Sequence, residues 1–176
     1  SGAAISIAVT MAENRIDNRV QAFIADIDHG VKATGSISLT ATENAEIRAL
    51  SAAASLAVAI DGGFSGGGVE AVNKVSNVVA AFIENAVLVQ AGGDISLKAA
   101  DTATVTATLP VYSFAAGVVA AAGATSVSEN LINDTVEVRI DGANVKSAGV
   151  GGISLTTTSD TTVTADNLTV TATVGL

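Results

Sequence analysis

Apolar and polar residues alternate along most of the chain, which is the period of strands with one buried face. In the segment 14–24, for example, Ile16 and Ile24 share one parity, while Arg15 and Asp17 share the other. Val, Ile and Thr supply many of the alternating positions, and these β-branched residues fit a pleated, half-buried surface. The pattern therefore predicts an all-β protein.

The alternating segments recur with a period of about 58 residues. An Ile-Ser-Leu core occurs at 37–39, 95–97 and 153–155, each copy 58 residues after the last. A second landmark opens with Asn14, is repeated from Asn73, and occurs a third time from Asn130. A fixed period of this length is the signature of a repeat architecture, in which equivalent strands stack on one another. We place the repeats at 1–63, 64–123 and 124–176, with the third shorter than the others.

The Ala-rich segment 49–59 favours a helix by propensity alone. We interpret it as a strand, because its counterpart in the third repeat, 167–174, alternates and is rich in β-branched residues. The single Pro110 is expected at the start of a segment or at a bend, where a missing N–H matters least.

These observations predict one structural unit, 1–176, that folds as a parallel β-helix, or β-solenoid. A repeat of 58 residues looks too long for one coil of a narrow solenoid. We therefore expect two or three coils of roughly 20 to 30 residues in each repeat. Six to nine coils, stacked about 4.8 Å apart, would form a rod on the order of 30 to 45 Å long.

Two segments resemble known bacterial proteins. The run from Gly92 to Ala107 is similar to the coils of filamentous-haemagglutinin-like exoproteins, and the Asn landmark at 73–83 resembles the β-strand repeats of very large bacterial surface proteins. The resemblance extends over nearly the whole chain. It implies a right-handed parallel β-helix, secretion, and a structural or adhesive role, and it identifies no ligand.

Polar residues recur at equivalent positions of the three repeats. One column holds Asn14, Asn73 and Asn130, and another holds Asn18, Asn77 and Asp134. Stacked side chains of this kind can bond to one another and to the turn backbone, so we predict a structural ladder. A role in ligand binding is the weaker interpretation.

The charge and composition of the chain limit the classes of partner that it is expected to bind. The net charge is −9, and only 8 Lys and Arg residues are present, none of them clustered. This argues against nucleic acids and anionic membrane surfaces, which require clustered cations. No apolar run reaches the roughly 20 residues of a membrane span. An acidic chain with no Cys fits an extracellular or cell-surface location without disulfides.

Two motifs could carry chemistry. Gly63-Phe64-Ser65-Gly66-Gly67 matches the G-x-S-x-G nucleophile elbow, which requires a following helix and a later His. The only His, His29, comes earlier, so we interpret the motif as a flexible Gly-rich turn.

Asp26, Asp28 and His29 could together bind a cation. The other repeats lack the His, and an exposed turn explains all three copies. We predict no catalytic residue, no metal site and no cofactor.

The expected function is structural, with no enzymatic activity: a repeat segment of a large secreted or cell-surface adhesin or extracellular fibre, acting as a stiff rod. One alternative is a binding module whose lateral face recognises a glycan or a protein. Another is a filament subunit that stacks end to end. The expected partners are neighbouring repeats, copies of the same chain, or an extracellular glycan or protein.

Overall fold

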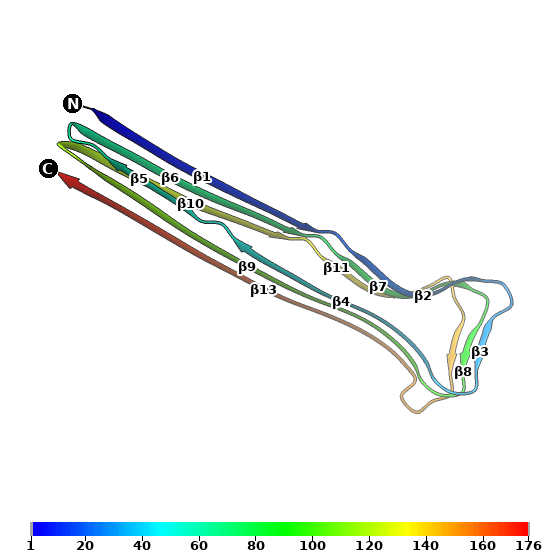
Figure 1. Ribbon diagram of the computed structural model, residues 1–176. Helices are drawn as coiled ribbons and strands as arrows, with labels where there is room; N and C mark the ends of the chain where they lie inside the picture. Colours follow the sequence, from blue (N-terminus) through cyan, green and yellow to red (C-terminus); the bar gives the residue numbers. More distant parts are fainter. Residues whose placement is uncertain (1, 176) are drawn as a thin grey trace.

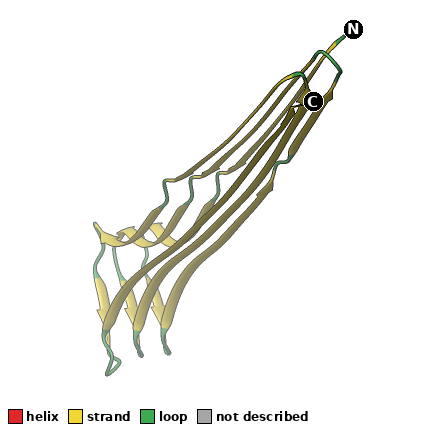
Figure 2. Cartoon of the chain, turned by 90° about the vertical axis from the view of Figure 1, so that its left-hand side faces the viewer, coloured by secondary structure: helices red, strands yellow, loops and turns green. Residues whose placement is uncertain are grey.

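The chain is built from β-strands that wind through three successive coils (Figure 1). The computed structural model describes residues 2–175, and within that range Figure 2 shows strands and connecting loops without helices. The prediction of an all-β parallel β-helix is confirmed.

Each coil contains the same succession of strands, except that the last strand is divided into two in coil 1. Coil 1 consists of β1 (Ala3–Ile16), β2 (Arg19–Ile27), β3 (Val31–Ala33), β4 (Ile37–Leu50) and β5 (Ala53–Val58). Coil 2 consists of β6 (Gly62–Val75), β7 (Val78–Ala86), β8 (Val89–Ala91) and β9 (Ile95–Gly117). Coil 3 consists of β10 (Val119–Ile132), β11 (Thr135–Asp141), β12 (Val145–Ser147) and β13 (Ile153–Gly175).

Equivalent strands of successive coils pair in parallel and without slippage. The four sheets have the orders β1-β6-β10, β11-β7-β2, β12-β8-β3 and β13-β9-β4, and β5 also pairs with β9. In the last of these sheets Ile37 pairs with Ile95, and Ile95 pairs with Ile153. Each 58-residue repeat is therefore one coil.

This overturns the expectation of two or three coils per repeat. The reason is strand length: β9 and β13 have 23 residues each, and β1, β4, β6 and β10 have 14. At about 3.3 Å per residue, β9 alone extends about 75 Å, whereas three coils stack to only about 14 Å. The molecule is a flat blade elongated along its strands, and the predicted rod of six to nine coils is wrong (Figure 1).

The blade has two different ends. Both chain termini lie at one end, where coils succeed one another; we call this the termini end (Figure 1). At the other end β3, β8 and β12 join the two layers of the blade; we call this the hooked end (Figure 2). Sheets β1-β6-β10 and β11-β7-β2 form one layer, and sheet β13-β9-β4 forms the facing layer.

The hooked end has an interior of large apolar side chains. Its buried cluster includes Val79, Ile83, Val89, Ile95 and Leu97, each contributed by coil 2 and covered by the coils on either side. Burial of such side chains is the main favourable term in folding, at about 1.5–3 kcal/mol each.

The termini end has an interior of small side chains. Ala57, Ser55, Ser113 and Ala115 are buried there. The layers approach so closely at Gly63 that an added Cβ would lie 3.0 Å from the carbonyl oxygen of Ala57 and closer still to another backbone oxygen. Glycine is required at such a close backbone approach because it has no Cβ.

Pro110 lies in the middle of β9 rather than at the start of a segment. Coil 1 is interrupted opposite it, since β4 ends at Leu50 and β5 begins at Ala53. The pairs on either side of the gap join Leu50 to Thr108 and Ala53 to Val111. The missing N–H of Pro110 therefore interrupts no strand pair with coil 1. The Ala-rich segment on either side of the gap is strand, as predicted.

Candidate functional site

The first column of Asn residues forms a hydrogen-bonded ladder through the blade. Asn14 Nδ2 donates to Asn73 Oδ1 over 2.9 Å, and Asn73 Nδ2 donates to Asn130 Oδ1 over 2.8 Å. The ladder follows from the register of β1, β6 and β10, which pairs these three residues directly. Asn73 is fully buried, so its two bonds are needed to compensate its desolvation.

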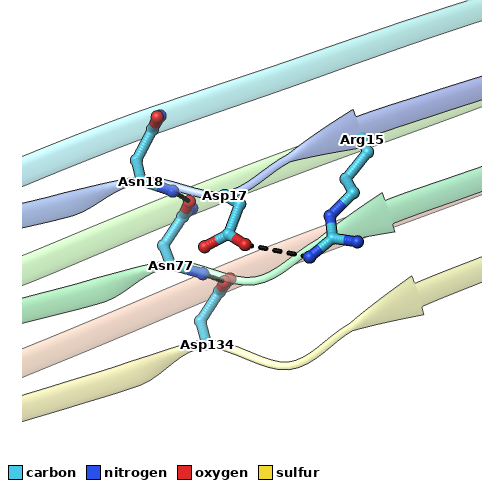
Figure 3. A network of polar contacts seen from close by, with 5 residues as sticks. All are labelled: Arg15, Asp17, Asn18, Asn77 and Asp134. Atoms are coloured by element: carbon cyan, nitrogen blue, oxygen red, sulfur yellow. Dashed lines mark hydrogen bonds and ion pairs between the residues drawn. The ribbon is translucent and has the colours of Figure 1, made fainter.

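In the second column, side-chain oxygens accept hydrogen bonds from the backbone of the preceding coil. Asn77 Oδ1 accepts a hydrogen bond from the N–H of Asn18 over 3.2 Å, and Asp134 Oδ1 accepts one from the N–H of Asn77 over 2.6 Å. Figure 3 shows the three side chains one above another, where each coil passes between two strands. Asn77 and Asp134 thus each satisfy a backbone donor at the break between strands, where no sheet partner is available.

A third column faces the second from the opposite layer of the blade. It holds Glu43, Asp101 and Ser159, which are paired in register across β4, β9 and β13. Asn18 Nδ2 donates to Glu43 Oε1 over 2.8 Å, and Asn77 Nδ2 approaches Asp101 Oδ1 at 3.4 Å. We call the three columns together the polar band.

Sequence reasoning missed Glu43 and Asp101. The signal was present in the alternation, because Asp101 shares the parity of Ala103, Val105 and Ala107, which point inward. An acidic residue at an inward position is rare unless its charge is paired or neutralised.

Two carboxyl groups, the buried Asp101 and the partly buried Asp134, lie near each other in the polar band. Asp101 is fully buried, and Oδ2 of each residue has no hydrogen-bond partner within residues 2–175. Burial, the adjacent Asp134 carboxyl and, to a smaller extent, the charge of Glu43 together raise the pKa of Asp101 from 3.8 to about 6, against a lowering by Asn77. Asp101 therefore keeps its proton to a higher pH than an ordinary Asp.

The G-x-S-x-G motif is neither an elbow nor a flexible turn. It lies within strand β6, which corrects the interpretation of a Gly-rich turn. Ser65 points into the thin interior, where its hydroxyl lies 2.8 Å from that of Ser55 and 2.6 Å from that of Ser113. Gly63 and Gly67 are explained by the close approach of the two layers rather than by chain reversal.

The segment around Asp26 belongs to the edge of the hooked end. Asp26 has a φ of 54° and accepts a hydrogen bond from Asn85 Nδ2 over 3.2 Å. Asn85 has a φ of 47° at the corresponding place in coil 2, and in coil 3 that conformation falls on Gly142, at 57°. Within residues 2–175, no group of three or more His, Cys, Asp and Glu residues is placed to hold a metal ion.

An aromatic column lies on the outside of the hooked end. The rings of Phe23 and Phe82 stack with their centroids 5.1 Å apart. The guanidinium of Arg139 lies 4.5 Å from the centroid of Phe82 and also forms ion pairs with Glu84 and Glu137. A cation over an aromatic face contributes about 0.5–1 kcal/mol at an exposed site.

An apolar groove runs along the outside of the termini end. It is lined by Ile5, Ile7, Phe64, Gly66 and Gly123 from three adjacent strands. Ile7 is 74% exposed, and its neighbours in β1 at the two nearest outward positions are equally open. Gly66 and Gly123 form the floor, since they contribute no side chain beside the isoleucine ridge. Apolar side chains of this size on an outer face mark a surface capable of docking.

The geometry defines a parallel β-helix of three coils. Its polar band lies between an interior of large apolar side chains at the hooked end and an interior of small side chains at the termini end. Comparisons with protein-family models, with curated proteins and with solved structures found no match. No family or homologue is therefore identified, and the resemblance to haemagglutinin-like exoproteins stays a prediction. In the part of the chain that the structure describes, no helix is long and apolar enough to cross a membrane.

Proposed function

We propose that this chain is a structural repeat segment of a large secreted or surface-displayed bacterial exoprotein, a stiff adhesin or fibre element with no catalytic role. The observation that carries the proposal is the uninterrupted register of the three coils, in which all the strands of one coil pair with their equivalents in the next. An architecture of this kind grows by adding coils and derives its stiffness from backbone ladders and nearest-neighbour packing.

The arrangement of polar groups supports the same role. Side chains of the first Asn column bind one another, and side chains of the second column bind the backbone of the neighbouring coil. These hydrogen bonds hold successive coils together. Ser65, the one residue in a nucleophile motif, is held inside a cluster of three hydroxyl groups. The acidic, Cys-free composition is compatible with an extracellular environment and favours solubility.

Surface labelling tests this proposal. Antibodies raised against the chain should label intact cells of the bacterium that produces it, with an antibody to a cytoplasmic protein as the control for leakage. Labelling that appears only after permeabilisation would contradict a surface or secreted role. Turnover of any acidic polysaccharide by the purified chain would contradict the absence of catalysis.

The apolar groove favours a second candidate, a lateral-face binding module for proteins. The groove offers Ile, Phe, Ala and Gly surfaces and few polar groups, which suits apolar protein side chains better than a glycan. Ile7→Lys should abolish binding to immobilised extracellular-matrix proteins if the groove is the site, whereas Thr102→Lys on the opposite layer should not. Equal binding by both variants would exclude the groove.

A further inference from the structure

We propose that copies of the chain pack face to face at the termini end, with the strands of successive blades aligned. The apolar groove on the layer of β1, β6 and β10 then receives an aromatic ridge, Tyr112 and Phe114 of β9, from the other layer of the next copy. The inference rests on the proposed structural role and identifies the occupant of the groove as a second copy. It uses only the lateral faces of the blade, which stay free when further coils are added to the array.

The aromatic ridge projects from the middle of its layer. Tyr112 and Phe114 point outward from coil 2 and are 38% and 43% exposed, although coils 1 and 3 flank them on both sides. Tyr112 lies between the smaller Ala54 and Val170. Aromatic side chains bury large areas and are frequent anchors of protein interfaces. The exposure of this pair therefore does not depend on where the array begins or ends.

The apolar groove has its floor in the same coil. Gly66 and Gly68 point outward from β6 and contribute no side chain, while Ile7 and Val9 of β1 rise beside them. Phe64, two residues before Gly66, bounds the groove toward the chain termini. The floor is therefore lower than its surroundings by the depth of one side chain, which is the relief that a ridge of side chains requires.

The ridge and the groove lie at the same height on opposite layers. At Gly67, between the two floor glycines, an added Cβ would lie 2.7 Å from Val111 Cγ1 and 3.6 Å from the carbonyl oxygen of Tyr112. Tyr112 is thus level with the floor of the groove, on the other side of the blade. A second copy displaced along the sheet normal, without rotation, therefore places its Tyr112 over Gly66 and Gly68.

The register between the two layers is constant along coil 1. The hydroxyl of Thr10 lies 2.9 Å from that of Ser51, and Asn18 Nδ2 donates to Glu43 Oε1 over 2.8 Å. Both contacts cross the interior between β1 or β2 and the returning strands. Each step forward on one layer thus matches one step backward on the other, so outward residues at equal heights can be paired from the numbering.

Outward residues between these two contacts carry opposite charges at equal heights. Glu13 on the groove layer is level with Arg48 on the ridge layer, and Arg15 is level with Glu46. In the displaced copy, each of these charges faces its counter-charge. Such complementarity fixes the alignment of two surfaces more than it adds affinity. Since the two contacting faces are different, the contact does not close on itself, and copies add in layers.

Other charges limit the strength of the contact. In coil 3 Ser128 contacts Asn167, so Glu129 is level with Asp166, and these like charges face each other between copies. Each chain also carries a net charge of −9. Exposed ion pairs contribute little, so the apolar area must supply most of the affinity.

The area of the contact fits weak association that strengthens with array length. From Ala3 to Arg15 the face is about 43 Å long, and three coils are about 14 Å wide, which gives about 600 Å² per copy. Stable complexes bury about 800 Å² on each partner. Each further coil adds about 200 Å², so one more coil would reach the size of a stable interface.

Tyrosine fluorescence tests the contact at the ridge itself. Tyr112 is the only Tyr, and the chain has no Trp, so the emission reports on this position alone. Quenching by acrylamide should fall about threefold as the concentration rises from about 10 μM to about 1 mM, because Tyr112 enters the groove. X-ray scattering should show a spacing of about 20 Å, the thickness of two sheet layers. Quenching that is independent of concentration would overturn the inference, even if the chain associates through another surface.

Two variants block one face each. Gly66→Phe fills the groove, and its Cβ meets only Ile7, at 3.9 Å, so the fold should be kept. The double variant Tyr112→Ala, Phe114→Ala removes the ridge, and Tyr112→Phe, which keeps the ring, is its control. By sedimentation equilibrium, the control should associate as the wild-type chain does, and neither blocked variant should associate alone. Self-association of the ridge variant would overturn the inference.

A mixture of the two blocked variants gives the decisive result. One retains the ridge and the other retains the groove, so equimolar amounts should form 1:1 dimers and no larger species. The ridge variant contains no Tyr, so all emission comes from the Gly66→Phe partner, whose Tyr112 should regain its protection from acrylamide. A mixture that gives neither dimers nor protection would overturn the inference.

A charge exchange tests the alignment without altering the groove or the ridge. Glu13→Lys and Arg48→Glu should each weaken association about fivefold, because like charges then face each other between copies. The double variant restores opposite charges and should regain the wild-type affinity. Lys98→Glu changes the net charge as Arg48→Glu does but lies beyond the contact, so it should have no comparable effect. A double variant without recovery would overturn the contact. Surface labelling of cells would be unaffected, so failure here is distinguishable from failure of the structural role.

Discussion

The two ends of the blade solve the same packing problem in opposite ways. At the hooked end Val, Ile and Leu fill the interior, and charged residues such as Glu84 and Arg139 lie outside. At the termini end Ala, Ser and Gly fill the interior, and Ile7, Leu56 and Phe114 lie outside. Parallel strands thus pair equally well above either core, because backbone register and interior chemistry are separate requirements. The difference shows that apolar content does not by itself indicate which face of a strand is buried.

The largest effect is expected from a large residue placed in the closely packed interior of the termini end. Gly63→Val should cost more than about 3 kcal/mol of unfolding free energy, since the new side chain collides with backbone on the facing layer. Gly66→Ala is the matched control: its Cβ points outward, 3.9 Å from Ile7, and should be neutral or stabilising by up to about 1 kcal/mol. Urea midpoints of the two variants measure the difference. Similar midpoints would mean that the layers are free to separate.

A pair of leucines compares the two ends directly. Leu97 is fully buried at the hooked end, whereas Leu56 is 66% exposed at the termini end. Leu97→Ala should cost about 3 kcal/mol, and Leu56→Ala should change the unfolding free energy by less than about 0.5 kcal/mol. Equal losses in urea unfolding would show that the outer face of the termini end is buried in solution, for example by association.

The polar band between the two ends should make stability depend on pH. The pKa of Asp101 is raised from its ordinary 3.8 to about 6 in the folded chain. Between these values the folded state binds more protons than the unfolded state, so unfolding free energy falls as pH rises from 4 to 6, by about 2–3 kcal/mol. Asp101→Asn should remove this dependence and make the chain more stable at pH 7.

Urea unfolding at a series of pH values measures the effect, with Asp160→Asn as the control. Asp160 lies on β13 and is exposed, so its replacement should leave the slope of stability against pH unchanged. A slope that is the same for the wild-type chain and for Asp101→Asn would contradict the raised pKa of Asp101.

The smallest predicted effect concerns the Asn ladder. Asn73→Leu removes two hydrogen bonds in the middle of the band and should cost about 1–2 kcal/mol. Asn14→Leu removes one bond at a half-buried position and should cost about half as much. The comparison is made at low protein concentration, where chain association does not contribute. A larger loss for Asn14 would contradict a ladder stabilised mainly by its buried centre.

The repeat period and the alternation were sufficient to predict a parallel β-helix and to align equivalent residues such as Ile37 and Ile95. They could not predict the number of coils, because a period counts residues and not turns of the chain. Strands usually have 3–10 residues, so a 23-residue strand such as β9 is far outside the ordinary range. Gly92 and Pro110 are both residues that commonly end strands, yet only Gly92 lies in a bend between strands, whereas Pro110 lies within β9.

Part of the polar band was predictable from the alignment of the three repeats. Columns of Asn are visible once the repeats are aligned, whereas the contact between Asp101 and Asp134 joins different layers of the blade. No spacing in the sequence determines which residues of two facing layers meet. That depends on where the chain turns at the hooked end, and hence on the register of one layer over the other.

The return of every coil to the termini end has a mechanical consequence. A tensile load applied to the two chain ends acts across the strands, so it opens hydrogen bonds one after another, starting at an outermost coil (Figure 1). Each coil of 58 residues then lengthens to about 200 Å before the next begins to yield. A blade built from such coils should extend in equal steps under load and dissipate energy at each step.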